Sequence, residues 1–79
     1  MIKVNIENDD IRIVMSGNAS SITTDVATAI SYIYNAIKGQ SLSKAEALRN
    51  LLTLLMIDEE SPVWNDEGEM DGTVIMSLE

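Results

Sequence analysis

The chain has 79 residues, a net charge of −8 and neither Cys nor His, so it is long enough for one small domain and too short for two. Without Cys and His it can form no disulfide, no thiolate nucleophile, no histidine triad and no ordinary zinc or iron site. Hydrophobic residues make up 46% of the chain but aromatic residues only 4%, which predicts a globular domain with an aliphatic core.

The N-terminal segment predicts a β-hairpin. Residues 2–7 alternate between apolar and polar side chains, as in a half-buried strand. The polar residues 8–10 are typical of a turn and give a three-residue connection, after which residues 11–15 resume the alternation.

A first helix is expected over residues 22–38. Its apolar residues recur at helical spacing and form one stripe, which is expected to cover the hairpin: Ile22, Val26, Ala29, Ile30, Ile33 and Ile37. Ser20 or Ser21 is the expected N-cap, and Lys38 followed by Gly39 is a typical helix end.

A second helix is expected from a capping box at residues 43–46, Ser-Lys-Ala-Glu, to about Ile57. Its apolar residues occupy two sides. One side carries Ala45, Leu48, Leu51, Leu52 and Leu55, and the other carries Ala47, Leu54 and Ile57. A single contact face cannot bury both sides. Either the C-terminal segment folds back over the second side, with Trp64 among its apolar residues, or a second subunit covers it.

The negative charge is concentrated at the C-terminal end. Residues 1–57 form a neutral body of hairpin and helices, whereas residues 58–79 hold eight carboxylate side chains with no Lys or Arg. Residues 58–71 are expected to form a mobile loop, and 72–77 can form a third strand. The sequence therefore predicts a single α+β domain, in which two antiparallel helices pack on a β-hairpin and a third strand can be added by the C-terminal segment.

Three short patterns could carry chemistry. Glu67, Glu69 and Asp71 match the first half of a calcium loop, but Leu78 stands where the bidentate Glu is needed, so a solvated acidic loop is expected. Residues 41–44 match Ser-x-x-Lys, which is better explained by helix capping in so short a chain. Paired carboxylates such as Glu59 and its neighbour lack an apolar pocket that would adapt them to acid and base catalysis.

Two resemblances cover the N-terminal half. Residues 1–6, 16–17 and 30–38 are similar to small bacteriophage and prophage proteins of Gram-positive bacteria, which implies a phage accessory role. Residues 13–19 and 25–31 resemble the ribosomal-processing cysteine protease family. The catalytic residues of that family do not carry over. Asn18 stands in place of its histidine, and Ala27 or Thr28 in place of its cysteine, so the resemblance implies no protease activity here.

The expected function is that of a non-enzymatic, acidic protein-interaction module that forms a homodimer and needs no cofactor or metal. The candidate interface consists of Leu54, Ile57, Trp64, Tyr32 and Tyr34. Scattered cations argue against nucleic-acid binding, and the net charge argues against anionic membranes. A cytoplasmic location is expected, since no apolar run approaches the ~20 residues of a membrane span. The alternative is a nucleic-acid mimic, whose acidic residues would occupy the groove of a basic DNA-binding protein.

Overall fold

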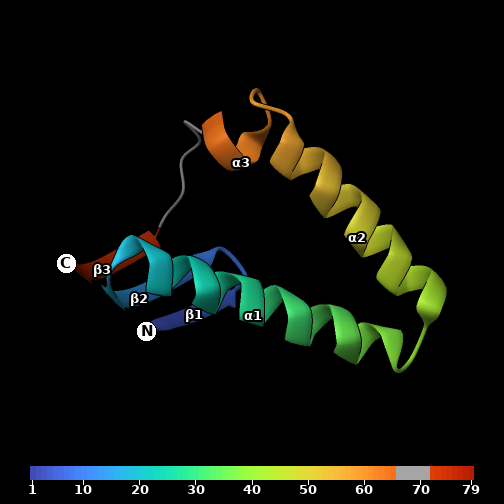
Figure 1. Cartoon of the computed structure of the whole chain (residues 1–79), viewed down its shortest axis with the longest axis horizontal. Coiled ribbons are helices and arrows are strands. Elements are labelled where there is room, and N and C mark those ends of the chain that lie inside the picture. Colours follow the sequence, from blue (N-terminus) through green and yellow to red (C-terminus); the bar gives the residue numbers. More distant parts are fainter. Residues whose placement is uncertain (66–71) are drawn as a thin grey trace. The chain divides into compact units, whose positions relative to one another are not determined.

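The structure is a computed structural model that describes residues 1–65 and 72–79. In chain order the elements are β1 (Ile2–Glu7), β2 (Asp10–Gly17), α1 (Ala19–Lys38), α2 (Leu42–Ile57), α3 (Pro62–Asn65) and β3 (Gly72–Leu78) (Figure 1). The α+β class is confirmed, with an N-terminal hairpin, two long helices and a third strand. The short helix α3 lies in the segment that was expected to be a loop, so that expectation is wrong for residues 62–65.

The three strands form one mixed sheet in the order β1-β2-β3. β2 is central, with β1 antiparallel on one side and β3 parallel on the other. Because Val4, Ile13 and Val74 stand in register, they share one face of the sheet. The other residues of this face are also apolar except for Gly17 and Gly72: Ile2, Ile6, Ile11, Met15, Met76 and Leu78. The sheet therefore has one apolar face that crosses all three strands.

The turn between β1 and β2 is tighter than the sequence predicts. Glu7 pairs with Asp10, so only Asn8 and Asp9 connect the strands. Asn8 adopts the left-handed region, with φ of 54°. Asn tolerates this conformation better than most residues because its short polar side chain can bond locally.

Both long helices begin earlier than expected because their caps lie further upstream. Asn18 caps α1: its Oδ1 accepts a hydrogen bond from the Ser21 amide at 2.8 Å. Ser41 caps α2, where its Oγ accepts from the Lys44 amide at 3.3 Å. The assignments of Ser20 or Ser21, and of Ser43, as caps are therefore wrong, whereas the predicted ends at Lys38 and Ile57 are confirmed.

The contacts divide the chain into two compact units. The first consists of Met1–Ala29 and Glu69–Glu79, and the second of Ile30–Gly68. In the first unit, the amino group of Met1 donates to the Ser16 carbonyl at 2.7 Å and forms an ion pair with Asp25 at 3.0 Å. These contacts join the start of β1 to the end of β2 and to α1.

The apolar face of the sheet is only partly covered. Val4, Ile6 and Val74 are more than half exposed, and the remaining residues of β3 are exposed as well. The expected covering of the hairpin by the α1 stripe is thus incomplete at these positions. In the second unit, Ala45 is completely buried, at 0% exposure, and Leu48, Leu52 and Leu55 on the same side of α2 are half-buried.

Candidate interaction surface at the α2–α3 corner

The C-terminal end of α2 is closed by the segment that follows it. The last carbonyls of a helix have no partner within the helix and need one from outside. Here the Asp58 amide donates to the Leu54 carbonyl at 3.2 Å, and the Ser61 hydroxyl donates to the Leu55 carbonyl. Ser61 is only 3% exposed. The segment after α2 is therefore anchored to the helix by specific hydrogen bonds.

Trp64 completes this closure. Its indole Nε1 donates to the carbonyl of Met56 at 3.1 Å, while the whole residue stays 60% exposed. The main chain of α3 is held in place too, since the Trp64 amide donates to the Ser61 carbonyl at 3.1 Å. The result is an aromatic ring that is fixed at one end and open to solvent, which is a feature of residues that dominate protein interfaces.

The second apolar side of α2 is exposed in the structure. Leu54 is 68% exposed and Ile57 is 74% exposed, and the two lie one turn apart. Leu51 is exposed one further turn toward the N-terminus, although the sequence pattern placed it on the other side. We call Leu51, Leu54 and Ile57 the outer stripe of α2. The helical pattern could have placed Leu51 here, because it lies at the boundary between the two sides.

Carboxylates flank the outer stripe. Asp58, Glu59 and Glu60 follow directly at the C-terminal end of α2, and all three are exposed. The first turn of α2 contains no acidic residue and its last turn no basic one, while Lys44 stands near its start. This is the reverse of the distribution that the helix dipole favours, in which cations lie at the C-terminal end. The negative charges here thus add to the negative end of the helix dipole.

The two tyrosines of the candidate interface lie elsewhere. Tyr32 and Tyr34 are on α1, where Tyr32 is exposed and Tyr34 is half-buried. Of the five predicted residues, Leu54, Ile57 and Trp64 belong to α2 and α3 and gather toward the end of α2.

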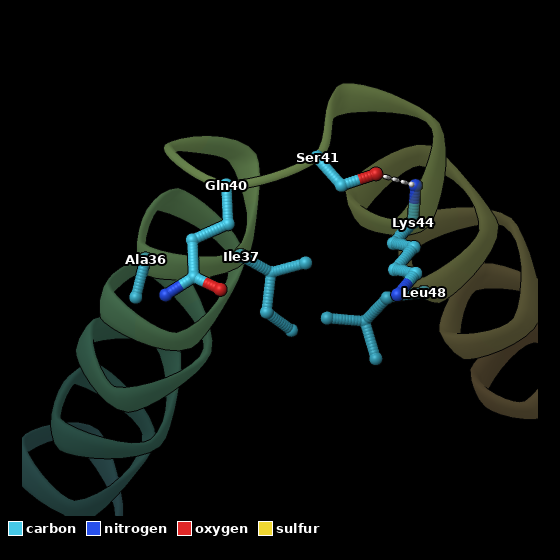
Figure 2. A pocket seen from close by; sticks show the side chains of 6 residues that line it. All are labelled: Ala36, Ile37, Gln40, Ser41, Lys44 and Leu48. Atoms are coloured by element: carbon cyan, nitrogen blue, oxygen red, sulfur yellow. Dashed lines mark hydrogen bonds between the residues drawn. The ribbon is translucent and has the colours of Figure 1, made fainter.

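A pocket lies at the turn between α1 and α2. Ile37 and Leu48 face each other across it, and Gln40, Ser41 and Lys44 line its polar side (Figure 2). The Ser-x-x-Lys pattern occurs here, and its serine is occupied as the cap of α2. The interpretation of this pattern as helix capping is confirmed.

The calcium-like pattern of Glu67, Glu69 and Asp71 lies outside the described residues. Within residues 1–65 and 72–79, no group of three or more acidic side chains is arranged to hold a metal ion. No helix in this part of the chain has the length and apolar character required to cross a bilayer.

Comparisons with known proteins found no relative of this chain. No protein family, no curated protein and no solved structure matches the chain.

Proposed function

We propose that this protein is a non-enzymatic interaction module. Its α2–α3 corner, which consists of the outer stripe, residues 58–60 and Trp64, binds a segment of a partner protein that is both apolar and basic. One observation carries the proposal: the exposed outer stripe and the anchored Trp64 lie beside three consecutive carboxylates. An apolar surface next to one sign of charge fits a segment that pairs a hydrophobic stripe with Lys or Arg.

The same charges argue against a parallel contact between the α2 helices of two copies at this corner. A two-fold contact in which the two α2 helices run parallel would bring Asp58, Glu59 and Glu60 of both copies close together, and residues 58–79 contain no cation to compensate them. Like charges that face each other across an interface cost affinity. A basic partner gains from the same carboxylates, so we assign the corner to a partner of opposite charge.

A cytoplasmic location and a phage or prophage accessory role are also part of the proposal. The accessory role rests on the similarity of residues 1–6, 16–17 and 30–38 to small phage proteins.

The proposal can be tested with two designed helical peptides that share one leucine stripe. The first peptide carries Lys on its polar face and the second carries Glu at the same positions. Fluorescence anisotropy should show that the Lys peptide binds, that its affinity falls as salt is added, and that the Glu peptide does not bind. Equal binding of both peptides would contradict the proposal.

Variants of the protein locate the binding surface. Replacing Leu54 and Ile57 together by Ser should weaken binding of the Lys peptide at least tenfold, because both side chains are exposed and make no closed core. Leu42→Ser is the matched control, since Leu42 is also an exposed leucine of α2 but lies at the opposite end of the helix. A Leu54 and Ile57 variant that binds as tightly as the original protein would assign binding to another surface.

The alternative, a nucleic-acid mimic, is favoured by a second acidic site. Glu7, Asp9 and Asp10 are exposed around the hairpin turn, where Arg12 lies 3.6 Å from Asp10. A mimic binds through carboxylates rather than through an apolar stripe. Glu59→Gln and Glu60→Gln should then abolish binding to a basic DNA-binding protein, while the Leu54 and Ile57 variant should bind unchanged. If the protein is instead an interaction module, the Glu59 and Glu60 variants and the Leu54 and Ile57 variant should all lose binding to the partner.

A further inference from the structure

Among residues 1–65 and 72–79, the outer edge of β3 shows none of the features that usually prevent strand pairing. β3 is an edge strand in the described sheet, and its residues Gly72–Leu78 contain no charge and no proline. All seven of them are exposed. Proteins protect long edge strands with charges, prolines, bulges or a covering segment. The opposite edge strand, β1, does carry charged side chains, Lys3 and Glu7.

The hydrogen bonds show which main-chain groups of β3 point outward. The Glu79 amide donates to the Gly17 carbonyl of β2 at 2.9 Å. Main-chain groups alternate in direction along a strand, so the odd-numbered residues of β3 face β2. The amides and carbonyls of the even-numbered residues, Gly72, Val74, Met76 and Leu78, therefore point to the outer edge.

The sequence of β3 is complementary to itself when reversed. Around the midpoint Ile75, an antiparallel copy would pair Val74 with Met76 and Thr73 with Ser77. The outward-facing residues then meet one another, as the antiparallel hydrogen-bond pattern requires, because Val74 pairs with Met76 and Gly72 with Leu78. Within Gly72–Leu78 every pair is uncharged, and the pairs match apolar with apolar (Val74 with Met76) and hydroxyl with hydroxyl (Thr73 with Ser77).

From this register we infer that the edge of β3 pairs with β3 of a second copy of this chain, in antiparallel orientation about a two-fold axis at Ile75. The pairing would join two three-stranded sheets into one sheet of six strands. Val74 and Met76 lie on the apolar face, so this face would continue across the axis from one copy to the other. The first unit comprises only about 40 residues without a disulfide, a size at which domains commonly need association for stability.

This inference is independent of the proposed binding at the α2–α3 corner. The sequence pattern of α2 suggested a dimer through Leu54 and Ile57, whereas the edge of β3 gives a contact between the uncharged residues of Gly72–Leu78. The residues of the β3 contact and those of the α2–α3 corner do not overlap.

The register can be tested by crosslinking, because the natural chain contains no Cys. In the proposed pair Ile75 stands opposite Ile75 of the second copy at a non-hydrogen-bonded position, where Cα atoms are about 4.5 Å apart. This separation suits a disulfide. Oxidation of the full-length Ile75→Cys protein should therefore give a covalent dimer.

Two further variants provide the matched controls. Thr73→Cys and Ser77→Cys should each crosslink poorly alone, because each of these residues lies far from the same residue of the second copy. An equal mixture of the two should crosslink efficiently, since Thr73 stands opposite Ser77. Efficient crosslinking of Thr73→Cys alone, or failure of both Ile75→Cys and the mixture, would overturn the register.

Noncovalent association gives a second measure. Sedimentation at tens of micromolar should show a dimer of the original protein. Ile75→Lys places two ammonium groups opposite each other and should raise the dissociation constant at least tenfold, while Ile75→Val should leave it within about threefold. Circular dichroism of the Ile75→Lys protein verifies that it is folded. A strictly monomeric original protein, or a folded Ile75→Lys protein that dimerises as tightly as the original, would overturn the inference.

Discussion

Trp64 on α3 and Met56 on α2 are joined by a hydrogen bond, in which the indole N–H donates to the Met56 carbonyl at 3.1 Å. The contact supplies one of the missing partners of the α2 end. It also fixes the orientation of a ring that is mostly exposed. The same bond thus stabilises the corner and holds the Trp64 ring in one orientation before a partner binds.

Trp64→Phe should loosen α3 while keeping an aromatic ring. The variant loses the indole donor, and such a hydrogen bond contributes about 0.5–1.5 kcal/mol. Hydrogen exchange of the α3 amides should become faster by the factor to which this free energy corresponds, because local opening of α3 would cost less free energy. Val63→Ala is the control, because Val63 is an exposed neighbour on the same short helix. Unchanged exchange in Trp64→Phe would show that the indole bond does not hold α3.

Asn18→Ala should destabilise α1, because it removes the side chain that accepts from the Ser21 amide. Loss of such a cap costs about 1 kcal/mol. Ser20→Ala is the matched control, since Ser20 lies within the first turn of α1 and is not its cap. Urea denaturation should show a lower midpoint for Asn18→Ala and a nearly unchanged midpoint for Ser20→Ala. If Ser20→Ala lowered the midpoint more than Asn18→Ala, Ser20 would be the cap instead of Asn18.

These caps show how far the sequence could locate the helices. The apolar stripe of α1 begins at Ile22, so the pattern places the start there and searches for a cap directly before it. The preceding residues 19–21 carry no apolar repeat, although they are helical. Asn18, which lies between β2 and α1, decides where the helix begins because its side chain caps the first turn. The same reasoning applies to α2, where Ser41 and not Ser43 is the cap.

The third strand and the short helix α3 were predictable to different degrees. The apolar run in residues 72–77 predicts a strand, but no local pattern states that it pairs with β2 or that it does so in parallel. That pairing depends on contacts distant in sequence. Ser61 followed by Pro62 is a typical helix start, and this signal could have revealed α3 within the acidic segment. The high charge of its surroundings favoured a loop instead.

The exposed side of α2 was the most predictable part of the candidate surface. Leu54 and Ile57 fall outside the main stripe of the helix, and both are exposed. The position of Trp64 was not predictable, because it depends on a bond to the Met56 carbonyl, a main-chain group that every residue has.

Ala45→Leu should destabilise the second unit. Ala45 is completely buried, so a larger side chain has no space without displacement of its neighbours. Such overpacking costs about 1–3 kcal/mol. Ala47→Leu is the matched control, because Ala47 is on the same helix but exposed. Thermal denaturation should show a lower midpoint for the Ala45 variant only, and similar midpoints for both would mean that the site around Ala45 can expand.

Gly17→Ala should destabilise the junction between β2 and α1 for two separate reasons. Gly17 has φ of 122°, a conformation that residues with a Cβ rarely adopt, and a Cβ placed there would lie 2.5 Å from the Ser21 Oγ. Backbone strain of this kind costs about 1–3 kcal/mol.

The matched control is Gly39→Ala, at the turn between the two long helices. A Cβ at Gly39 would lie 3.5 Å from the nearest atom, the Ala36 carbonyl oxygen, which is an ordinary contact. Urea denaturation should show a clearly lower stability for Gly17→Ala and a change of less than about 1 kcal/mol for Gly39→Ala.

A double variant separates strain from collision at Gly17. If the collision with the Ser21 hydroxyl contributes, Gly17→Ala combined with Ser21→Ala should be less destabilised than the sum of the two single variants. Because the positive φ remains in the double variant, part of the loss should persist. If the destabilisation of the double variant equals the sum of the two single variants, the whole effect of Gly17→Ala comes from backbone strain. If the double variant is as stable as the original protein, the whole effect comes from the collision.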